Sequence, residues 1–328
     1  MKIRQQDLKV VVIGGGTGLS TMLKGIKKYT SHITAVVTVS DNGGGSGKLR
    51  QEMGMIPPGD IRNCLVALAN TEPIMEKLLQ HRFKEGGLCG QSFGNLFLAA
   101  LTEITGSFEE AVKVTSNVLA ITGKVLPVTY EDVHLEAIFE DGEKVIGETQ
   151  IVDYSKEKLL DIKEIFLEPR NPKPAEEVMT AIEEADLIIF GPGSLYTSII
   201  SNLLVEKVTK QVAKSKADKI YVANVMTQPG ETTHLSLEDH VMILENYVGK
   251  GIINVVIANN ASIPEKYLKQ YNDDGAKVLK VDEEHEVWTR IQRIDAPLVS
   301  INEKKGLVRH DSMKLAQCIF ESALTKIT

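Results

Sequence analysis

Short runs of β-branched residues, each followed by a turn and a helical pattern, are the feature that most restricts the fold of this chain. The runs are apolar on both faces, which is typical of parallel strands that helices cover on both sides. We therefore predict a doubly wound, mostly parallel, Rossmann-like α/β sheet. The predicted strands are KVVVIGGG (9–16), ITAVVTVS (33–40), DLIIFGPG (186–193), KIYVANVM (219–226), INVVIANN (253–260) and, as the last, AKVLKVD (276–282).

Two stretches interrupt this alternation. Residues 57–120 show helical spacing, with Asp60 as the expected N-cap of one helix and another helix running from Ser92 to Gly106. Residues 125–168 alternate apolar and polar side chains around Asp-Gly at 141–142, which is typical of a hairpin. We expect a helical insertion (57–120) and a small antiparallel β insertion (125–168) within a single domain spanning residues 1–328.

Charge and composition exclude several classes of protein. The net charge of −7 argues against a general nucleic-acid binder. The three cysteines are far apart and form no C-x-x-C pair, so we expect no zinc site and no disulfide framework, and a cytoplasmic location. The N-terminal apolar run is too short for a signal peptide, and we expect no membrane span. A homodimer is common for such sheets, and the oligomeric state stays open.

The first predicted strand ends in the glycine-rich turn GGGTG, which opens a helix. Backbone N–H groups at a helix N-terminus favour an anion, so Gly15, Gly16, Thr17 and Gly18 are candidate phosphate-binding residues. The turn matches the dinucleotide fingerprint G-x-G-x-x-G only in part, because Leu19 occupies the third glycine position. The alternative is a tight turn without a ligand.

The segment SDNGGGSGKLR (40–50) follows the second predicted strand. It is not a P-loop, because its spacing is one residue short and Leu49 stands where the hydroxyl residue is needed. Asp41 lies where a dehydrogenase binds ribose, and its carboxylate is also a candidate metal ligand. A flexible surface loop is the alternative. The candidate nucleotide- or phosphate-binding residues are Asp41, Asn42, Gly43, Gly44, Ser46 and Lys48, with Arg50 adding positive charge.

Two later strands also end in polar, glycine-rich segments. The carboxyl ends of parallel strands meet at one edge of a sheet, so we expect all these segments to converge on one crevice. Such a crevice suits a nucleotide with more than one phosphate, and plain helix capping is the alternative for the first of the two segments. The candidates are Gly191, Gly193 and Ser194 after one strand and Asn224, Thr227 and Gln228, followed by Glu231, after the next.

The ordered set GGGTG, SDNGGGSGKLR, PPGDIRN, GNL, GPGSLYTS and MTQPGET resembles the YvcK family of bacterial gluconeogenesis factors, within the CofD-like superfamily. The resemblance extends from Gly14 to VRHD (308–311). It implies a cytoplasmic protein that binds UDP-sugars such as UDP-N-acetylglucosamine and acts in cell shape and peptidoglycan synthesis during gluconeogenic growth. It implies no catalytic activity, and it leaves regulatory or cell-wall-synthesis partners unidentified.

The resemblance also places Arg309 near a diphosphate, where its fork suits a bidentate contact. Arg62, Asn63 and Asn95 lie at predicted helix starts and are expected to face the same cleft. The alternatives are a solvated helix face for Arg62 and a surface cation for Arg309. Asp311 or Ser312 is expected to cap the C-terminal helix, with phosphorylation as the alternative role of the Ser312 hydroxyl.

Two enzymatic functions are the alternatives. The CofD-like relatives move a phospholactyl group from a nucleotide diphosphate donor to a deazaflavin with Mg²⁺, which Asp41 and Asp60 would hold here. Asn42 replaces the second acid of the family loop, which argues against a two-carboxylate metal site in that loop. An NAD-binding oxidoreductase is the other alternative, with Asp41 on the ribose.

Overall fold

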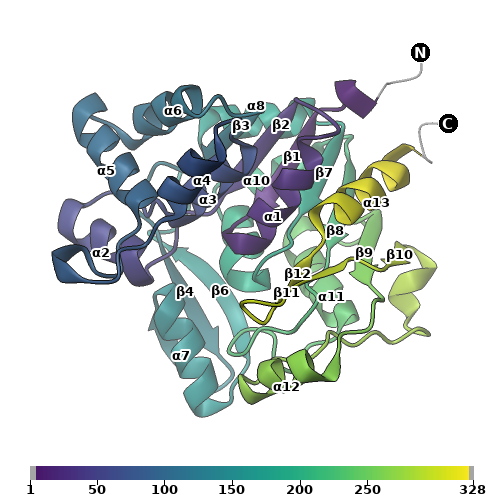
Figure 1. Cartoon of the computed structure of the whole chain (residues 1–328). Coiled ribbons are helices and arrows are strands. Elements are labelled where there is room, and N and C mark those ends of the chain that lie inside the picture. The colour runs from purple at the N-terminus through teal and green to yellow at the C-terminus, as the bar shows by residue number, and fades with distance from the viewer. Residues whose placement is uncertain (1–4, 325–328) are drawn as a thin grey trace.

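A seven-stranded sheet forms the centre of the computed structural model, which describes residues 5–324 (Figure 1). Its strands are β1 (Val10–Gly14), β2 (Ile33–Val37), β3 (Lys124–Pro127), β7 (Leu187–Phe190), β8 (Asp218–Val222), β9 (Val255–Asn259) and β10 (Gln292–Ala296). The strand order is β10-β9-β8-β7-β1-β2-β3, and each neighbouring pair is parallel. The predicted doubly wound α/β sheet is confirmed.

Helices form a layer on each face of the sheet (Figure 1). In one layer α1 packs between α3 and α13, and in the other α10 contacts both α8 and α11. A π-helical turn, η3 (Leu195–Ile200), continues into α9 (Ser201–Leu203). The other helices are α1 (Gly16–Ile26), α2 (Gly44–Met53), α3 (Gly59–Leu68), α4 (Pro73–Gln80), α5 (Phe93–Thr105), α6 (Phe108–Val118), α7 (Glu148–Lys158), α8 (Glu176–Glu184), α10 (Val208–Lys214), α11 (Leu237–Val248), α12 (Glu265–Asp273) and α13 (Ser312–Leu324), with short turns η1 (Gln5–Asp7), η2 (Gly86–Leu88) and η4 (Glu286–Thr289).

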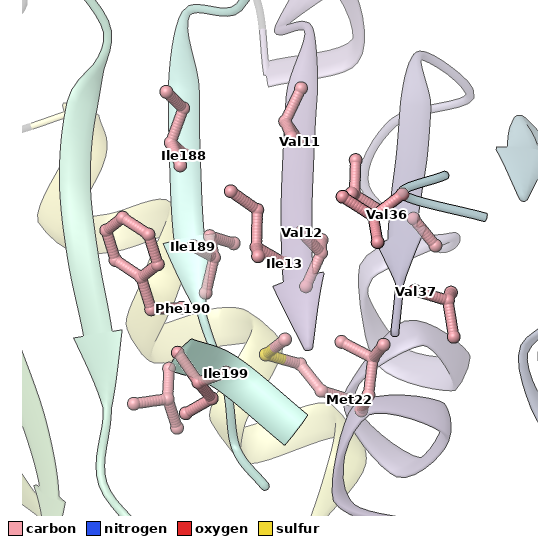
Figure 2. Packing of buried hydrophobic residues seen from close by; sticks show 14 of the residues in the cluster. Val11, Val12, Ile13, Met22, Val36, Val37, Ile188, Ile189, Phe190 and Ile199 are labelled. Atoms are coloured by element: carbon pink, nitrogen blue, oxygen red, sulfur yellow. The ribbon is translucent and has the colours of Figure 1, made fainter. Parts of the chain in front are cut away.

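The core lies where β1 and β7 pair. Every residue of these two strands is buried, as their unbroken apolar runs predict. Figure 2 shows Met22 of α1 and Ile199 of η3 beside the carboxyl ends of these strands. Each fully buried aliphatic side chain contributes roughly 1.5–3 kcal/mol to the free energy of unfolding. This packing therefore holds α1 and η3 firmly at the edge of the sheet where the candidate loops emerge.

The two interrupting stretches are largely as expected. Residues 57–120 contain α3, α4, α5 and α6, and Ser92 caps α5 by accepting the N–H of Asn95 at 3.3 Å. A three-stranded antiparallel sheet has the order β5-β4-β6, and α7 lies beside it, apart from the large sheet (Figure 1). It starts later than residue 125, because Lys124–Pro127 pairs with β2 in the large sheet. Its strands are β4 (His134–Phe139), β5 (Lys144–Ile146) and β6 (Ile162–Glu168).

Two local predictions are wrong. Asp60 does not cap α3: the helix begins at Gly59 without a side-chain cap, and the Asp60 carboxylate accepts the N–H of Gly16 instead. Residues 276–282 form no strand of the large sheet, since Val278 makes only an isolated bridge to Met226. The last strand of the sheet is β10, which the sequence pattern hides because an edge strand is half exposed and therefore polar.

The C-terminal region adds a hairpin and a helix. Strands β11 (Val299–Asn302) and β12 (Leu307–His310) form a two-stranded antiparallel sheet. Asp311 caps α13 as predicted, since its carboxylate accepts the N–H groups of Met313 at 3.0 Å and Lys314 at 3.1 Å. Across the described residues, no helix combines the length and the apolar character that crossing a bilayer requires.

Candidate functional site

The sheet has a topological switch point between β1 and β7. From β1 the chain adds β2 and β3 on one side, and later β7, β8, β9 and β10 on the other. Loops therefore diverge at the carboxyl ends of β1 and β7 and leave a crevice, which is where such sheets bind ligands. A cavity of about 600 Å³ lies there, and we call it the cleft. Ten of the predicted residues line it, namely Gly15, Gly16, Thr17, Gly18, Gly193, Ser194, Asn224, Thr227, Gln228 and Arg309.

The turn between β1 and α1 is closely packed against its surroundings. A Cβ on Gly15 would lie 2.6 Å from Oδ2 of Asp60, and one on Gly18 would lie 2.6 Å from the carbonyl oxygen of Pro192. Real Cβ atoms essentially never come that close, so only glycine fits at either position. The turn that follows β1 and the loop that follows β7 therefore form one continuous wall of the cleft.

Side chains of the loop after β8 hold the loop after β7. The Asn224 amide accepts the N–H of Gly193 at 3.1 Å and donates to its carbonyl at 2.7 Å. Gln228 donates to Oγ of Ser194 at 2.6 Å. These contacts satisfy Asn224 and Gln228 within the protein, so both residues shape the cleft wall and keep Gly193 and Ser194 in place.

Arg309 of β12 lines the cleft together with Tyr271 of α12. Its guanidinium donates to the Val308 carbonyl at 2.9 Å and to the Tyr271 hydroxyl at 3.3 Å. The Tyr271 hydroxyl in turn accepts the N–H of Val308 at 3.0 Å. Because Arg309 is exposed and its partners are uncharged, its fork can still bind a phosphate. Apolar residues of the lining, among them Val225 and Met226, give the cleft a surface for a base or sugar ring.

Four carboxylates interact electrostatically with one another, and one of them, Asp60, contacts the turn after β1. Burial, followed by the charge of Asp41, raises the pKa of Asp60 to about 6. Burial, and then the charges of Asp41, Glu231 and Asp60, raise the pKa of Glu148 well above its usual value. Burial also raises the pKa of Glu231, although Thr197 donates to it from its hydroxyl at 3.0 Å and its backbone N–H at 3.3 Å. We call Asp41, Asp60, Glu148 and Glu231 the acidic cluster.

The acidic cluster fits Mg²⁺ in part. Among residues 5–324, no three Asp, Glu, His or Cys side chains are placed to hold one metal ion together. Mg²⁺, however, usually takes one or two carboxylates and completes its shell with phosphate oxygens and water. The mutual repulsion of Asp41 and Asp60 would be relieved by a cation, so these two carboxylates suit the ion when a phosphate ligand is present.

A family model described as 2-phospho-L-lactate transferase CofD matches residues 10–299. The chain belongs to the CofD family. It is 53% identical over 311 residues to the "Putative gluconeogenesis factor" of Thermoanaerobacterium thermosulfurigenes, covering 95% of each chain. It is 46% identical over 317 residues to the gluconeogenesis factor of Bacillus subtilis, covering 96% of this chain and 98% of that one. The family resemblance of the motifs is confirmed.

A solved structure agrees with the fold of this CofD-family chain. The crystal structure of a UPF0052-family protein from Bacillus halodurans, at 2.60 Å resolution, superposes with a TM-score of 0.90 and 42% sequence identity. It covers 95% of this chain and 99% of that one. The likeness extends over the large sheet, the helices and the small antiparallel sheet together.

The loop at 40–50 lies outside the cleft lining. The Asn42 side chain accepts the N–H of Thr149 at 3.0 Å and donates to Gln150 at 2.7 Å, which ties the loop to the start of α7. Asp41 accepts the N–H of Gly43 at 2.8 Å. Lys48 is half exposed and lies 3.8 Å from Glu52. Asp41, at the edge of the acidic cluster, is therefore the residue of this loop with a direct electrostatic link to the cleft wall.

The remaining members of this loop have structural surroundings. Gly43 precedes α2, and Gly44 adopts a positive φ of 49° in its first turn. Ser46 accepts a hydrogen bond from Asn95 at 3.4 Å, so these two predicted residues meet each other. The Arg50 side chain is 5% exposed and donates to Asp132 and to the Val133 carbonyl, away from the cleft. Their predicted part in phosphate binding stays a prediction.

Three further predicted residues lie beside the cleft. Gly191 directly precedes the lining residue Pro192 and has a positive φ of 75°. Arg62 and Asn63 of α3 line a neighbouring cavity instead. Both cavities are lined by Thr17, Thr21, Arg309 and His310.

Sequence reasoning missed several lining residues, chiefly Lys156, Tyr271 and Asp274. Lys156 belongs to α7, which the strand-like alternation of residues 125–168 concealed. Tyr271 and Asp274 lie at the end of α12, a helix that follows no glycine-rich turn. No motif marks these positions, and only the folded chain brings them opposite the turn after β1.

Proposed function

We propose that this CofD-family chain binds a nucleotide diphosphate sugar in the cleft, of the UDP-N-acetylglucosamine type. The observation that carries the proposal is the meeting of two glycine-rich loops from neighbouring strands at the switch point, with Arg309 opposite them. Asp60 already accepts the N–H of Gly16, so the start of α1 offers the backbone N–H groups that follow it to a diphosphate, and Arg309 supplies a charged guanidinium group. The apolar lining near Val225 and Met226 suits the base or the sugar.

The names of the relatives support a proposal for the biological role. Relatives are named gluconeogenesis factors, and the YvcK resemblance implies a part in cell morphogenesis and wall synthesis during gluconeogenic growth. We infer that the protein is a cytoplasmic sensor without catalytic activity, which would pass on the presence of the sugar nucleotide to regulatory or wall-synthesis partners. A homodimer would be one way to present such a signal, and analytical ultracentrifugation with and without ligand tests it.

Isothermal titration calorimetry tests the binding. We expect UDP-N-acetylglucosamine to bind more tightly than UDP, and UDP more tightly than UMP, because the diphosphate contacts both loops and Arg309. Arg309→Gln should weaken the sugar nucleotide at least about tenfold, since an Arg–phosphate hydrogen bond is charge-assisted. NAD is titrated alongside, because a dinucleotide is the other predicted ligand. Tighter binding of NAD than of any UDP compound would overturn the proposal.

The acidic cluster supports a second candidate function, a Mg²⁺-dependent transferase of the CofD type. Asp41 and Asp60 would hold the ion, which would neutralise charge on a diphosphate leaving group. A panel of nucleotide diphosphate donors and a deazaflavin acceptor is incubated with Mg²⁺, and phosphodiester product is sought by mass spectrometry. Absence of product, combined with binding of UDP-N-acetylglucosamine, would favour the non-catalytic function.

A further inference from the structure

A second cavity adjoins the cleft along α1, and we call it the basic cavity. Its volume is about 510 Å³, and its walls come from α1, α3, the segment after α4 and the β11–β12 hairpin. Leu307 is the one apolar side chain in its lining, and no carboxylate lines it. Four cations do, namely Lys24, Arg62, Arg82 and Arg309.

The basic cavity gathers the arginines that form no salt bridge with a described carboxylate. Seven arginines lie among residues 5–324, and four of them form salt bridges with carboxylates: Arg50, Arg170, Arg290 and Arg293. The other three form no salt bridge with any described residue, and all three line the basic cavity: Arg62, Arg82 and Arg309. The unpaired guanidinium groups of the described chain are therefore gathered in one place.

The current partners of these arginines are uncharged. Arg62 donates to the Ser92 hydroxyl at 2.5 Å and to the Asn63 amide oxygen at 2.7 Å. Its Nε is buried and has no hydrogen-bond partner among the described residues. Arg82 donates to the Gly90 carbonyl, and Arg309 donates to a carbonyl and a phenol hydroxyl. Guanidinium groups bound only to neutral oxygens retain most of their attraction for an anion.

Like charges also repel each other across the cavity. Burial, and then the charge of Arg82, lower the pKa of Arg62, and the charge of Asp60 opposes them with a smaller effect. Lys24 is partly neutralised by Glu76 at 2.7 Å, and both side chains are nearly half exposed. His310 adds no charge near neutral pH, because burial lowers its pKa to about 4. An anion in the cavity would relieve the repulsion between Arg62 and Arg82.

We propose that the basic cavity binds the phosphate group of a small molecule. Several guanidinium groups, together with the Thr17 hydroxyl as a further donor, match the three terminal oxygens of a phosphate monoester. The site extends beyond the sugar-nucleotide cleft, and its binding of phosphate can be measured on the ligand-free chain. The phosphate comes either from a separate phosphorylated molecule or from the same ligand reaching past Arg309, which lines both cavities.

Titration of the ligand-free full chain tests the proposal. Inorganic phosphate is titrated at constant ionic strength set with sodium chloride, and glucose 6-phosphate is compared with glucose. The variants are Arg82→Gln and Lys24→Gln, with Lys113→Gln as the matched control. Lys24 and Lys113 have side chains that are each 46% exposed and paired with glutamate, but only Lys24 lines the cavity. Thermal melting confirms that each variant is folded.

We expect phosphate and glucose 6-phosphate to bind the unmodified chain and the Lys113→Gln variant equally, and glucose not at all. Arg82→Gln should weaken phosphate at least about tenfold, and Lys24→Gln should weaken it less because Glu76 already offsets that charge. No phosphate binding by the unmodified chain, or equal affinity in all four proteins, overturns the proposal. If Arg82→Gln does not fold, Lys24→Gln against Lys113→Gln decides it.

A second titration distinguishes the two sources of phosphate. Phosphate binding that persists with UDP-N-acetylglucosamine saturating the cleft supports a separate molecule in the basic cavity. Phosphate that the sugar nucleotide displaces, together with a weaker affinity of Arg82→Gln for that nucleotide, supports a phosphate of the same ligand. If no nucleotide binds, the proposed function fails while the phosphate titration on the ligand-free chain can still be interpreted.

Discussion

Single contacts around the turn after β1 determine how the cleft wall is built. The Asp60 carboxylate accepts the N–H of Gly16 at 2.7 Å and lies where a Cβ on Gly15 would be. A buried acid therefore stands directly behind a turn that suits an anion. We therefore expect substitutions of Gly15 and of Asp60 to change the stability of the chain, and each substitution is tested on its own.

Gly15→Ala should destabilise the chain. The added Cβ would lie 2.6 Å from Oδ2 of Asp60 and 2.8 Å from Cγ2 of Thr38, and Thr38 is itself held by Ser201 at 2.9 Å. Overpacking of this kind costs about 1–3 kcal/mol of the free energy of unfolding, measured by urea denaturation. Gly87→Ala is the control, because nothing lies within 4 Å of its added Cβ. Equal stability of the two variants would contradict this packing.

Asp60→Asn should change how stability depends on pH. The folded-state pKa of Asp60 is about 6, above its ordinary value of 3.8. Between these values the folded chain holds the proton more tightly than the unfolded chain, so this residue's contribution to stability falls as pH rises from about 4 to about 6. Asparagine carries no such proton. The variant should therefore gain stability relative to the unmodified chain across this range, by at most about 3 kcal/mol.

The measurement for Asp60→Asn is denaturation at a series of pH values in metal-free buffer. The relative gain should level off above about pH 7, where Asp60 is ionised in both states. A difference between the two proteins that does not vary with pH would show that Asp60 titrates normally.

At the scale of elements, the loop that leads into α2 has a glycine-rich sequence typical of a binding site, but its contacts connect parts of the fold. The loop is tied to α7 through Asn42, and Arg50 in the last turn of α2 binds Asp132 and Val133, the two residues that precede β4. These contacts attach the small antiparallel sheet to α2, which follows strand β2 of the large sheet. The positive charge of the segment therefore serves this attachment at Arg50 and lies on the surface at Lys48.

Arg50→Gln and Lys48→Gln should differ sharply. Loss of the buried Arg50 contacts should lower the free energy of unfolding by roughly 1.5–3 kcal/mol, as for hydrogen bonds to charged groups. Loss of the exposed Lys48 should change it by less than about 0.5 kcal/mol. Guanidinium chloride denaturation measures both. A larger loss of stability in Lys48→Gln than in Arg50→Gln would contradict this structural role. A loss of nucleotide affinity in Lys48→Gln would show that the loop takes part in binding.

At the scale of the whole molecule, the cleft joins segments from both halves of the chain. The turn after β1 lies near the start of the sequence, whereas Tyr271 and Arg309 lie in its last quarter. A ligand in the cleft therefore links parts that separate on unfolding, and binding to the folded state alone must stabilise the entire domain.

Ligand binding should raise the melting temperature. UDP-N-acetylglucosamine at about one hundred times its Kd should add about 2.7 kcal/mol to the free energy of unfolding. Differential scanning fluorimetry measures the shift, and N-acetylglucosamine, which lacks the diphosphate, should give none. Arg309→Gln should show a smaller shift at the same concentration. An equal shift with the free sugar would mean that the diphosphate contributes nothing to binding.

The amino-acid sequence alone determined five of the seven strands of the central sheet. The strands β1, β2, β7, β8 and β9 were predictable because their buried faces require unbroken apolar runs. The glycine turns were predictable because close backbone approach excludes every larger residue, as at Gly15 and Gly18. The family was also readable, since its motifs follow one another in order along the chain.

Only the tertiary structure decided which polar residues meet. Local patterns do not show that Asp60 turns toward Gly16, that Asn42 holds α7, or that Arg62 lines a second cavity beside Arg309. The edge strand β10 was not predicted from the sequence, because a half-exposed strand needs no apolar run. Hydrophobic spacing along a sequence is a local property, whereas the partners of a charge are set by contacts between residues far apart in the chain.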